Sequence, residues 1–268
     1  MNDASIVRSI GPDTAALGAR AAHHLNITFR DCMRIPGSVH RDRYMSLVTG
    51  EMHPMGNIAI VADPGDPDVT RSAVEPLLAN DYPAAVIYPC GAEGDVARVV
   101  REAGFGIEER MPAMAVEIAS MAPTTLPAGY EWARIGEGAE GRDWVEALAI
   151  GYGLPEPLAA LFGPEQLGAD MAPDARVQFF AVLKSGKVVS TSLLYLADGL
   201  AGIYCVATLP GERNKGLGAH ATAEALRIAR QLGYHVGVLQ SSAAGHGVYL
   251  RLGFGDYGAV PMFIRIPA

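Results

Sequence analysis

The sequence predicts an α/β protein of mixed α+β type that folds as two domains. Runs rich in β-branched and aromatic residues alternate with segments of helical period along all 268 residues, and half of the residues are hydrophobic. A chain of this length can bury two ordinary cores. Prolines and small polar residues at 119–129 divide the chain, so we place a first domain at 1–120, a linker at 121–129 and a second domain at 130–268.

The first half opens with a helical pattern at 14–25, followed by an ambiguous segment. Strand patterns at 44–49 and 57–62 are expected to form a hairpin. A helix from Asp95 follows from apolar residues at helical spacing, and Gly104 ends it. The other expected elements are a helix at 69–79, a short buried strand at 84–88 and strand-like sequence at 105–118.

The second half starts again with a strand and then two helical segments. Two β-rich runs joined by Ser185-Gly186 predict a tight hairpin. A strand, a glycine-containing loop and a helix ending at Gly233 come next. The expected ranges are strand 130–135, helices 143–151 and 155–161, strands 177–183, 188–196 and 203–206, a helix to Arg230, strand 235–240, a short helix 247–252 and closing strands at 254–266.

The two halves echo each other in sequence. Gly104-Phe105 and Pro112 match Gly253-Phe254 and Pro261, with the same spacing from glycine to proline. The same order of hairpin, helix, strand and short helix precedes each match. We therefore interpret the first half as a degenerate duplicate of the second.

Composition restricts the class of protein. The formal net charge of −8 argues against a general nucleic-acid binder, which needs a basic surface. Three widely spaced cysteines fit reduced thiols, and the scattered histidines suggest no metal site. Charged residues near the N-terminus argue against a secretory signal, and no apolar run could span a membrane. We expect a cytoplasmic protein without nucleic-acid or membrane partners and without a metal.

The segment from Arg213 to Ala219 has the form R-x-x-G-x-G-A and joins a strand to a helix. Gly216 and Gly218 allow several backbone N–H groups to converge, and the helix N-terminus adds positive potential, so the loop predicts a phosphate site. It is neither a P-loop nor a dinucleotide fingerprint. Arg213 and Lys215 could be solvated loop charges, but their position before two glycines favours phosphate contact.

A second motif follows, in which Tyr249 begins YxxLGF. The order of strand, R-x-x-G-x-G-A, helix, strand ending at Gln240 and helix with YxxLGF resembles the GNAT N-acetyltransferase superfamily over about residues 177–266. This resemblance implies acetyl-CoA as co-substrate and two GNAT-like domains, each a twisted, mostly antiparallel mixed sheet flanked by helices. Only the second would be catalytic.

The resemblance also implies residue roles. Two central strands would splay apart to admit the pantetheine arm of acetyl-CoA, and the tyrosine at position 249 would protonate the departing thiolate. Tyr249 could otherwise be a core aromatic residue, and Cys205 is interpreted as part of the cofactor wall, not as a nucleophile. The expected cofactor-binding residues are Cys205, Val206, Ala207, Arg213, Asn214, Lys215, Gly216, Leu217, Gly218 and Ala219.

The chemistry fits these assignments but lacks a base. Attack by a neutral amine builds charge on the acyl oxygen and then on sulfur, which the Val206 N–H and the Tyr249 hydroxyl could stabilise. The strand before the loop carries no carboxylate. Candidates for the base are Glu212 in the loop, and otherwise Tyr204, Asp198 and His246.

Two classes of function remain open. The first is an N-acetyltransferase acting on a primary amine of a small molecule or peptide, with a homodimer left open. The second is a non-catalytic acyl-CoA sensor. A nucleotide-binding enzyme of another kind is a third, more distant alternative.

The first half has lost both motifs. DPGDPDVTR at 63–71 stands where the loop should be, and Val100 stands where Tyr249 should be. An acidic loop repels pyrophosphate, so we expect no acetyl-CoA site there. This half could line the substrate cleft, act as a scaffold or form a dimer contact.

Overall fold

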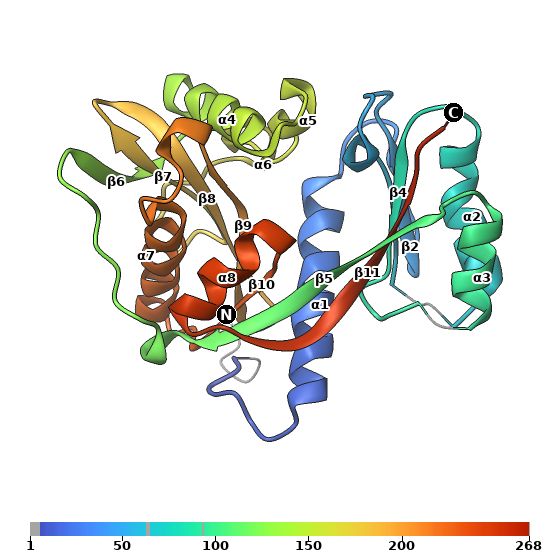
Figure 1. Ribbon diagram of the computed structural model, residues 1–268, viewed down its shortest axis with the longest axis horizontal. Helices are drawn as coiled ribbons and strands as arrows, with labels where there is room; N and C mark the ends of the chain where they lie inside the picture. Colours follow the sequence, from blue (N-terminus) through green and yellow to red (C-terminus); the bar gives the residue numbers. More distant parts are fainter. Residues whose placement is uncertain (1–5, 63–64, 93, 268) are drawn as a thin grey trace.

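The computed structural model describes residues 6–62, 65–92 and 94–267. Its strands form one mixed sheet in the order β1-β2-β3-β4-β11-β5-β10-β9-β8-β7-β6 (Figure 1). The mixed α/β class expected from the sequence is confirmed. The strands are β1 (Val39–His40), β2 (Tyr44–Val48), β3 (Asn57–Val61), β4 (Ala84–Ile87), β5 (Ile107–Glu117), β6 (Tyr130–Ile135), β7 (Val177–Lys184), β8 (Lys187–Ala197), β9 (Leu200–Thr208), β10 (Val236–Gln240) and β11 (Gly255–Arg265).

Helices cover both faces of this sheet. The apolar clusters place α1, α4 and α5 on one face and α2, α3, α7 and α8 on the other. Short 3-10 turns lie at Pro54–Gly56, Ile118–Ser120 and Pro210–Glu212. The helices are α1 (Thr14–Cys32), α2 (Pro67–Leu78), α3 (Asp95–Glu102), α4 (Ala139–Tyr152), α5 (Glu156–Ala160), α6 (Pro164–Leu167), α7 (Leu217–Gln231) and α8 (Ala243–Leu252).

Several helices are longer than their sequence patterns predict. The helix expected at 14–25 continues through the ambiguous segment to Cys32, because Leu25, Thr28 and Cys32 keep one buried stripe. The helix expected at 247–252 begins at Ala243, where the Ser242 side chain caps it by accepting a bond from the Gly245 N–H. Helix α4 likewise begins at Ala139, four residues before Asp143.

The two halves exchange their last strands. β5 of the first half pairs with β10 of the second, and β11 of the second half pairs with β4 of the first. β5 and β11 also pair with each other, side by side across the molecule (Figure 1). This pairing is symmetric under exchange of the halves: Pro261 pairs with Arg110, and their sequence counterparts Pro112 and Ala259 pair in turn.

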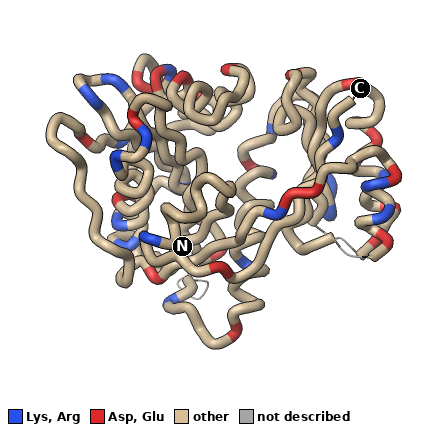
Figure 2. Tube along the Cα trace, in the orientation of Figure 1, with Lys and Arg blue, Asp and Glu red and all other residues tan. Residues whose placement is uncertain are grey.

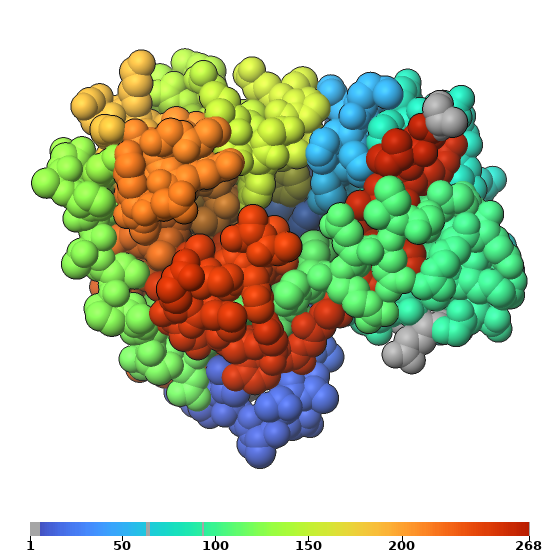
Figure 3. Space-filling view, in the orientation of Figure 1, coloured from blue at the N-terminus to red at the C-terminus, as the bar shows by residue number. Residues whose placement is uncertain are grey.

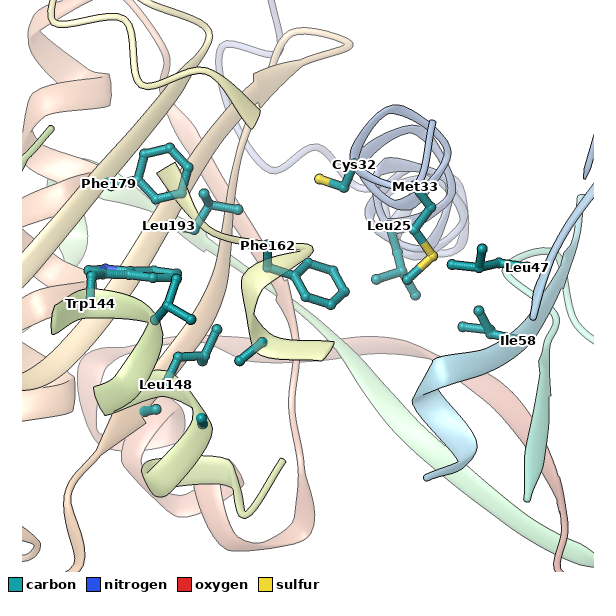
Figure 4. Packing of buried hydrophobic residues seen from close by; sticks show 14 of the residues in the cluster. Leu25, Cys32, Met33, Leu47, Ile58, Trp144, Leu148, Phe162, Phe179 and Leu193 are labelled. Carbon is teal, nitrogen blue, oxygen red and sulfur yellow. The ribbon is translucent and has the colours of Figure 1, made fainter. Parts of the chain in front are cut away.

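One apolar cluster runs from the first half into the second. Leu25 of α1 and Met33, which directly follows α1, point toward Leu47 and Ile58 of the first-half strands (Figure 4). On the other side, Phe162 packs edge-on against Phe29 of α1, with ring centroids 5.5 Å apart. Helix α1 therefore belongs to the cores of both halves, and its position is fixed relative to the second-half sheet.

Candidate functional site: an opening between two central strands

The strands β9 and β10 are parallel partners only at their beginnings. Ala201 pairs with Gly237 and Gly202 with Val238, whereas β9 continues to Thr208 without a further partner on that side in the part of the chain that the structure describes. Beyond Gly202 the two strands diverge. The sheet therefore has an internal edge with free backbone groups, where an extended ligand can pair as an added strand.

A β-bulge shapes β9 inside this opening. Thr191 of β8 pairs with Ala207 and Leu193 with Tyr204, so that a single β8 residue faces both Cys205 and Val206. Cys205 has φ +53°, a left-handed conformation that costs about 1 kcal/mol or more for a residue with a side chain. Because of the bulge, Cys205 packs toward α1, α4 and α5, and Val206 toward α7 and α8.

The N-terminus of α7 lies beside the end of β9 and is not capped. Gly216, with φ +77°, is the N-cap residue, and among the described residues no side chain caps the first turn. The first helical bond runs from the His220 N–H to the Gly216 carbonyl, so the N–H groups of the preceding turn are available. A Cβ on Gly218 would lie 3.5 Å from both Thr208 and Val206. An anion at this helix end would therefore lie next to the strand opening.

The charged side chains of the loop hold its shape. Arg213 donates to the carbonyls of Thr208 (3.2 Å) and Gly151 (2.8 Å), and this ties the loop to β9 and to α4. Lys215 donates to Glu212 at 2.7 Å and to the Tyr130 hydroxyl at 3.2 Å. The side chains of Arg213 and Lys215 are therefore engaged within the protein, and the backbone N–H groups are the direct means of holding an anion here.

Tyr249 lies on α8, half-buried in the same cluster as Val206. Its ring packs edge-on against Phe254, with centroids 5.7 Å apart. Burial raises the pKa of Tyr249 to about 12, and the nearby Thr222 hydroxyl lowers it slightly. Thr222 makes no hydrogen bond of ordinary geometry among the described residues. Tyr249 is thus held protonated at neutral pH.

A second tyrosine, which the sequence does not single out, lies at the same place. Tyr152 is the last residue of α4, and its neighbour Gly151 packs so closely on Ala207 that an added Cβ would come within 2.7 Å. Half of Tyr152 is solvent-exposed, yet burial among surrounding atoms, with Tyr249 and Cys205 nearby, raises its pKa well above the usual value.

The structure gives each of the four candidate bases a different environment. Lys184 and Lys215 bond to Glu212 and lower its pKa to about 2, so its carboxylate is engaged. Asp198 pairs with Arg20 at the β8–β9 turn, at the opposite end of β9 from the bulge. His246 bonds to Asp256 at 2.9 Å.

Tyr204, the fourth candidate, contacts a buried histidine. Its hydroxyl is 2.7 Å from Nδ1 of His24 in α1. The sequence pattern gave this histidine no functional role. Burial lowers the pKa of His24 to about 3, so the ring is neutral and an unprotonated Nδ1 accepts a hydrogen bond from the Tyr204 hydroxyl. Tyr204 is thus a donor to His24 and not a free base.

In the described residues of the first half, the matching strands stay paired and the matching helix N-terminus is capped. β3 and β4 stay paired from Ile58 to Ile60, so no opening follows. The N-terminus of α2 is capped by the Asp66 carboxylate, which accepts from the Asp68 N–H at 2.9 Å, and this bond is the main reason that the pKa of Asp66 is lowered. Asp63 and Pro64 of the acidic loop lie outside the described residues.

No cluster of three or more His, Cys, Asp or Glu residues suited to a metal occurs in the described ranges. Within the same ranges, none of the helices is long and apolar enough to cross a membrane.

Residues 147–254 match the model of the Acetyltransferase (GNAT) family. This segment contains the strand opening, the bulge, the loop and Tyr249, and the chain therefore carries a GNAT domain. A comparison with curated proteins gave no significant match.

Solved structures share the fold over nearly the whole chain. A GCN5-related N-acetyltransferase from Kribbella flavida is 23% identical and superposes with a TM-score of 0.61, covering 91% of this chain and 95% of that one. One from Sphaerobacter thermophilus is 15% identical with a TM-score of 0.61, covering 97% and 95%. A GCN5-related N-acetyltransferase-like protein from Streptococcus suis is 14% identical with a TM-score of 0.56, covering 94% and 100%. At these identities the likeness concerns the fold.

Proposed function

We propose that this protein transfers the acetyl group of acetyl-CoA to a primary amine, with one cofactor bound by the second half of each chain. The observation that carries the proposal is the uncapped N-terminus of α7 beside the internal edge of β9. The loop N–H groups would hold the pyrophosphate, and the β9 edge at Cys205, Val206 and Ala207 would pair with the pantetheine arm. The acetyl group would then lie at the bulge.

The reaction follows from the groups at that point. The amine nitrogen bonds to the acetyl carbon and releases a proton to water, while the carbon–sulfur bond breaks. The Val206 N–H stabilises the charge on the acyl oxygen. Tyr249, whose pKa burial raises to about 12, is protonated, and its hydroxyl would hydrogen-bond to the sulfur as charge develops there and pass a proton to the thiolate as the thiol departs. Solvent then reprotonates Tyr249.

In this proposal the first half, residues 1–120, is a duplicated domain that has lost its cofactor site, and residues 130–268 are the catalytic domain. The capped N-terminus of α2 and the unbroken β3–β4 pairing support the loss. The symmetric pairing of β5 with β11 supports the duplication.

The experiment combines calorimetry with thiol release. We expect one CoA per chain, and we expect Tyr249→Phe to lower kcat by about 100-fold or more with unchanged CoA affinity, because only the general acid is lost. Tyr257→Phe, which alters a phenol outside the site, is the control. Full turnover by Tyr249→Phe would remove its catalytic role. Tight CoA binding with no thiol release on any amine would instead identify an acyl-CoA sensor.

A further inference from the structure

The two halves enclose a hollow next to the proposed acetyl site. In the space-filling view α1 lies at its floor, and α5, the hairpin of β2 and β3, β5 and α8 surround it (Figure 3). Tyr204 and Cys205 belong to the apolar cluster that α1 shares with α5. Burial raises the pKa of Cys32 in α1 to about 12 and also raises the pKa of Cys205, to which nearby Cys32 contributes. The bulge of β9 therefore faces α1.

The segments around the hollow carry apolar side chains that the fold leaves partly exposed. They come from both halves and pack against the shared cluster without being covered: Phe29 of α1, Met55 of the β2–β3 hairpin, Met111 of β5 and Leu161 after α5. Phe29 contacts Phe162 across the two halves. Exposed acidic and basic side chains are dense on the outer helices α2 and α3, and β5 also carries exposed Glu108, Glu109 and Arg110 next to Met111 (Figure 2).

The charge at the end of α1 is already neutralised inside the protein. Asp31 accepts a bond from the Tyr195 hydroxyl at 2.6 Å and pairs with Arg176 at 3.1 Å. Arg176 also lies over the Tyr195 ring, 4.8 Å from its centroid. This carboxylate is therefore already paired with a cation of the protein.

We propose that the acceptor is a primary amine bearing an aromatic or bulky apolar group, which binds in this hollow against Phe29, Met55 and Leu161. The inference rests on the proposed function, because it assigns the substrate of that same site. The first half thus supplies part of the acceptor pocket. It takes this role through α1 and the β2–β3 hairpin, although its own cofactor site is closed.

An apolar pocket also accounts for how the amine becomes reactive. Burial of an ammonium group in apolar surroundings lowers its pKa, so the neutral amine needed for attack is favoured. β9 carries no carboxylate between Leu200 and Thr208, and Glu212 is held by two lysines. The pocket itself then replaces a general base, and the amine loses its proton to water as it enters.

The test compares amines of similar basicity but different polarity: 2-phenylethylamine against ethanolamine and putrescine, with thiol release from acetyl-CoA as the readout. We expect kcat/KM for 2-phenylethylamine to be at least about tenfold higher, and Phe29→Ala and Met55→Ala each to reduce that preference about tenfold. Leu78→Ala, a partly exposed leucine on the outer helix α2, is the control.

Calorimetry with CoA and thermal melting show whether each variant still folds and binds cofactor. A preference for ethanolamine or putrescine, or a preference for 2-phenylethylamine that Phe29→Ala and Met55→Ala leave intact, overturns this inference and leaves the proposed function standing. Failure of every amine to release thiol from bound acetyl-CoA overturns both.

Discussion

His24 is a first-half residue that the second half encloses. Its ring lies on Gly202, where an added Cβ would be 2.3 Å from the ring, and it stacks beside Tyr204. Only glycine allows so close an approach of α1 to β9. The position of α1 over the strand opening therefore depends on this pair of residues, one from each half.

The pKa of His24 makes the stability of the fold depend on pH. Its folded pKa of about 3 lies below the unfolded value of 6.5, so the unfolded chain binds the extra proton between these values and stability falls as pH decreases. At pH 5 this amounts to about 2 kcal/mol. Urea unfolding at pH 7 and pH 5 should show that His24→Gln loses this part of the acid dependence, whereas His23→Gln, an exposed neighbour, keeps it. An equal acid slope in His24→Gln and the parent protein would contradict the assignment.

At the scale of elements, the N-termini of α2 and α7 differ in capping, and this difference predicts a substitution that blocks the proposed cofactor site. Asp66 fills the N-terminus of α2 with its own carboxylate, whereas Gly216 leaves that of α7 open. Gly216→Asp should therefore place a carboxylate where pyrophosphate is proposed to bind and lower CoA affinity at least about tenfold, measured by calorimetry. Gly233→Asp adds the same charge at another left-handed glycine, after the far end of α7, and should bind CoA normally. Equal affinities in both variants would place the phosphate elsewhere.

The elements that a local pattern encodes were predictable, and those set by distant partners were not. The loop from Arg213 to Ala219 and the helix carrying Tyr249 follow from glycine spacing and helical period. The bulge does not, because the left-handed Cys205 is imposed by its register with β8. Tyr152 and His24 were missed for the same reason: each reaches the site through contacts with residues far away in sequence.

At the scale of the whole molecule, the similar sequence patterns of the two halves hide the exchange of strands. β5 and β11 carry equivalent patterns, and so do β4 and β10, so the pattern cannot decide whether each last strand pairs within its own half or across. In the structure both cross. The boundary at 121–129 thus separates two segments of chain, while the sheet continues through both.

The exchange predicts that neither half folds alone. Without residues 1–120, β10 loses β5, and β11 loses both β5 and β4 as partners. Removal of β5 would also uncover the apolar surface of the second half that its buried residues contact. These residues are Ala113, Met114, Ala115 and Val116. The three strand edges left unpaired and this surface favour aggregation. We expect the fragment 130–268 to lack a cooperative thermal transition and CoA binding, and co-expression with 1–120 to restore both. A soluble 130–268 fragment that binds CoA would show instead that β11 can fold back against β10 within its own half.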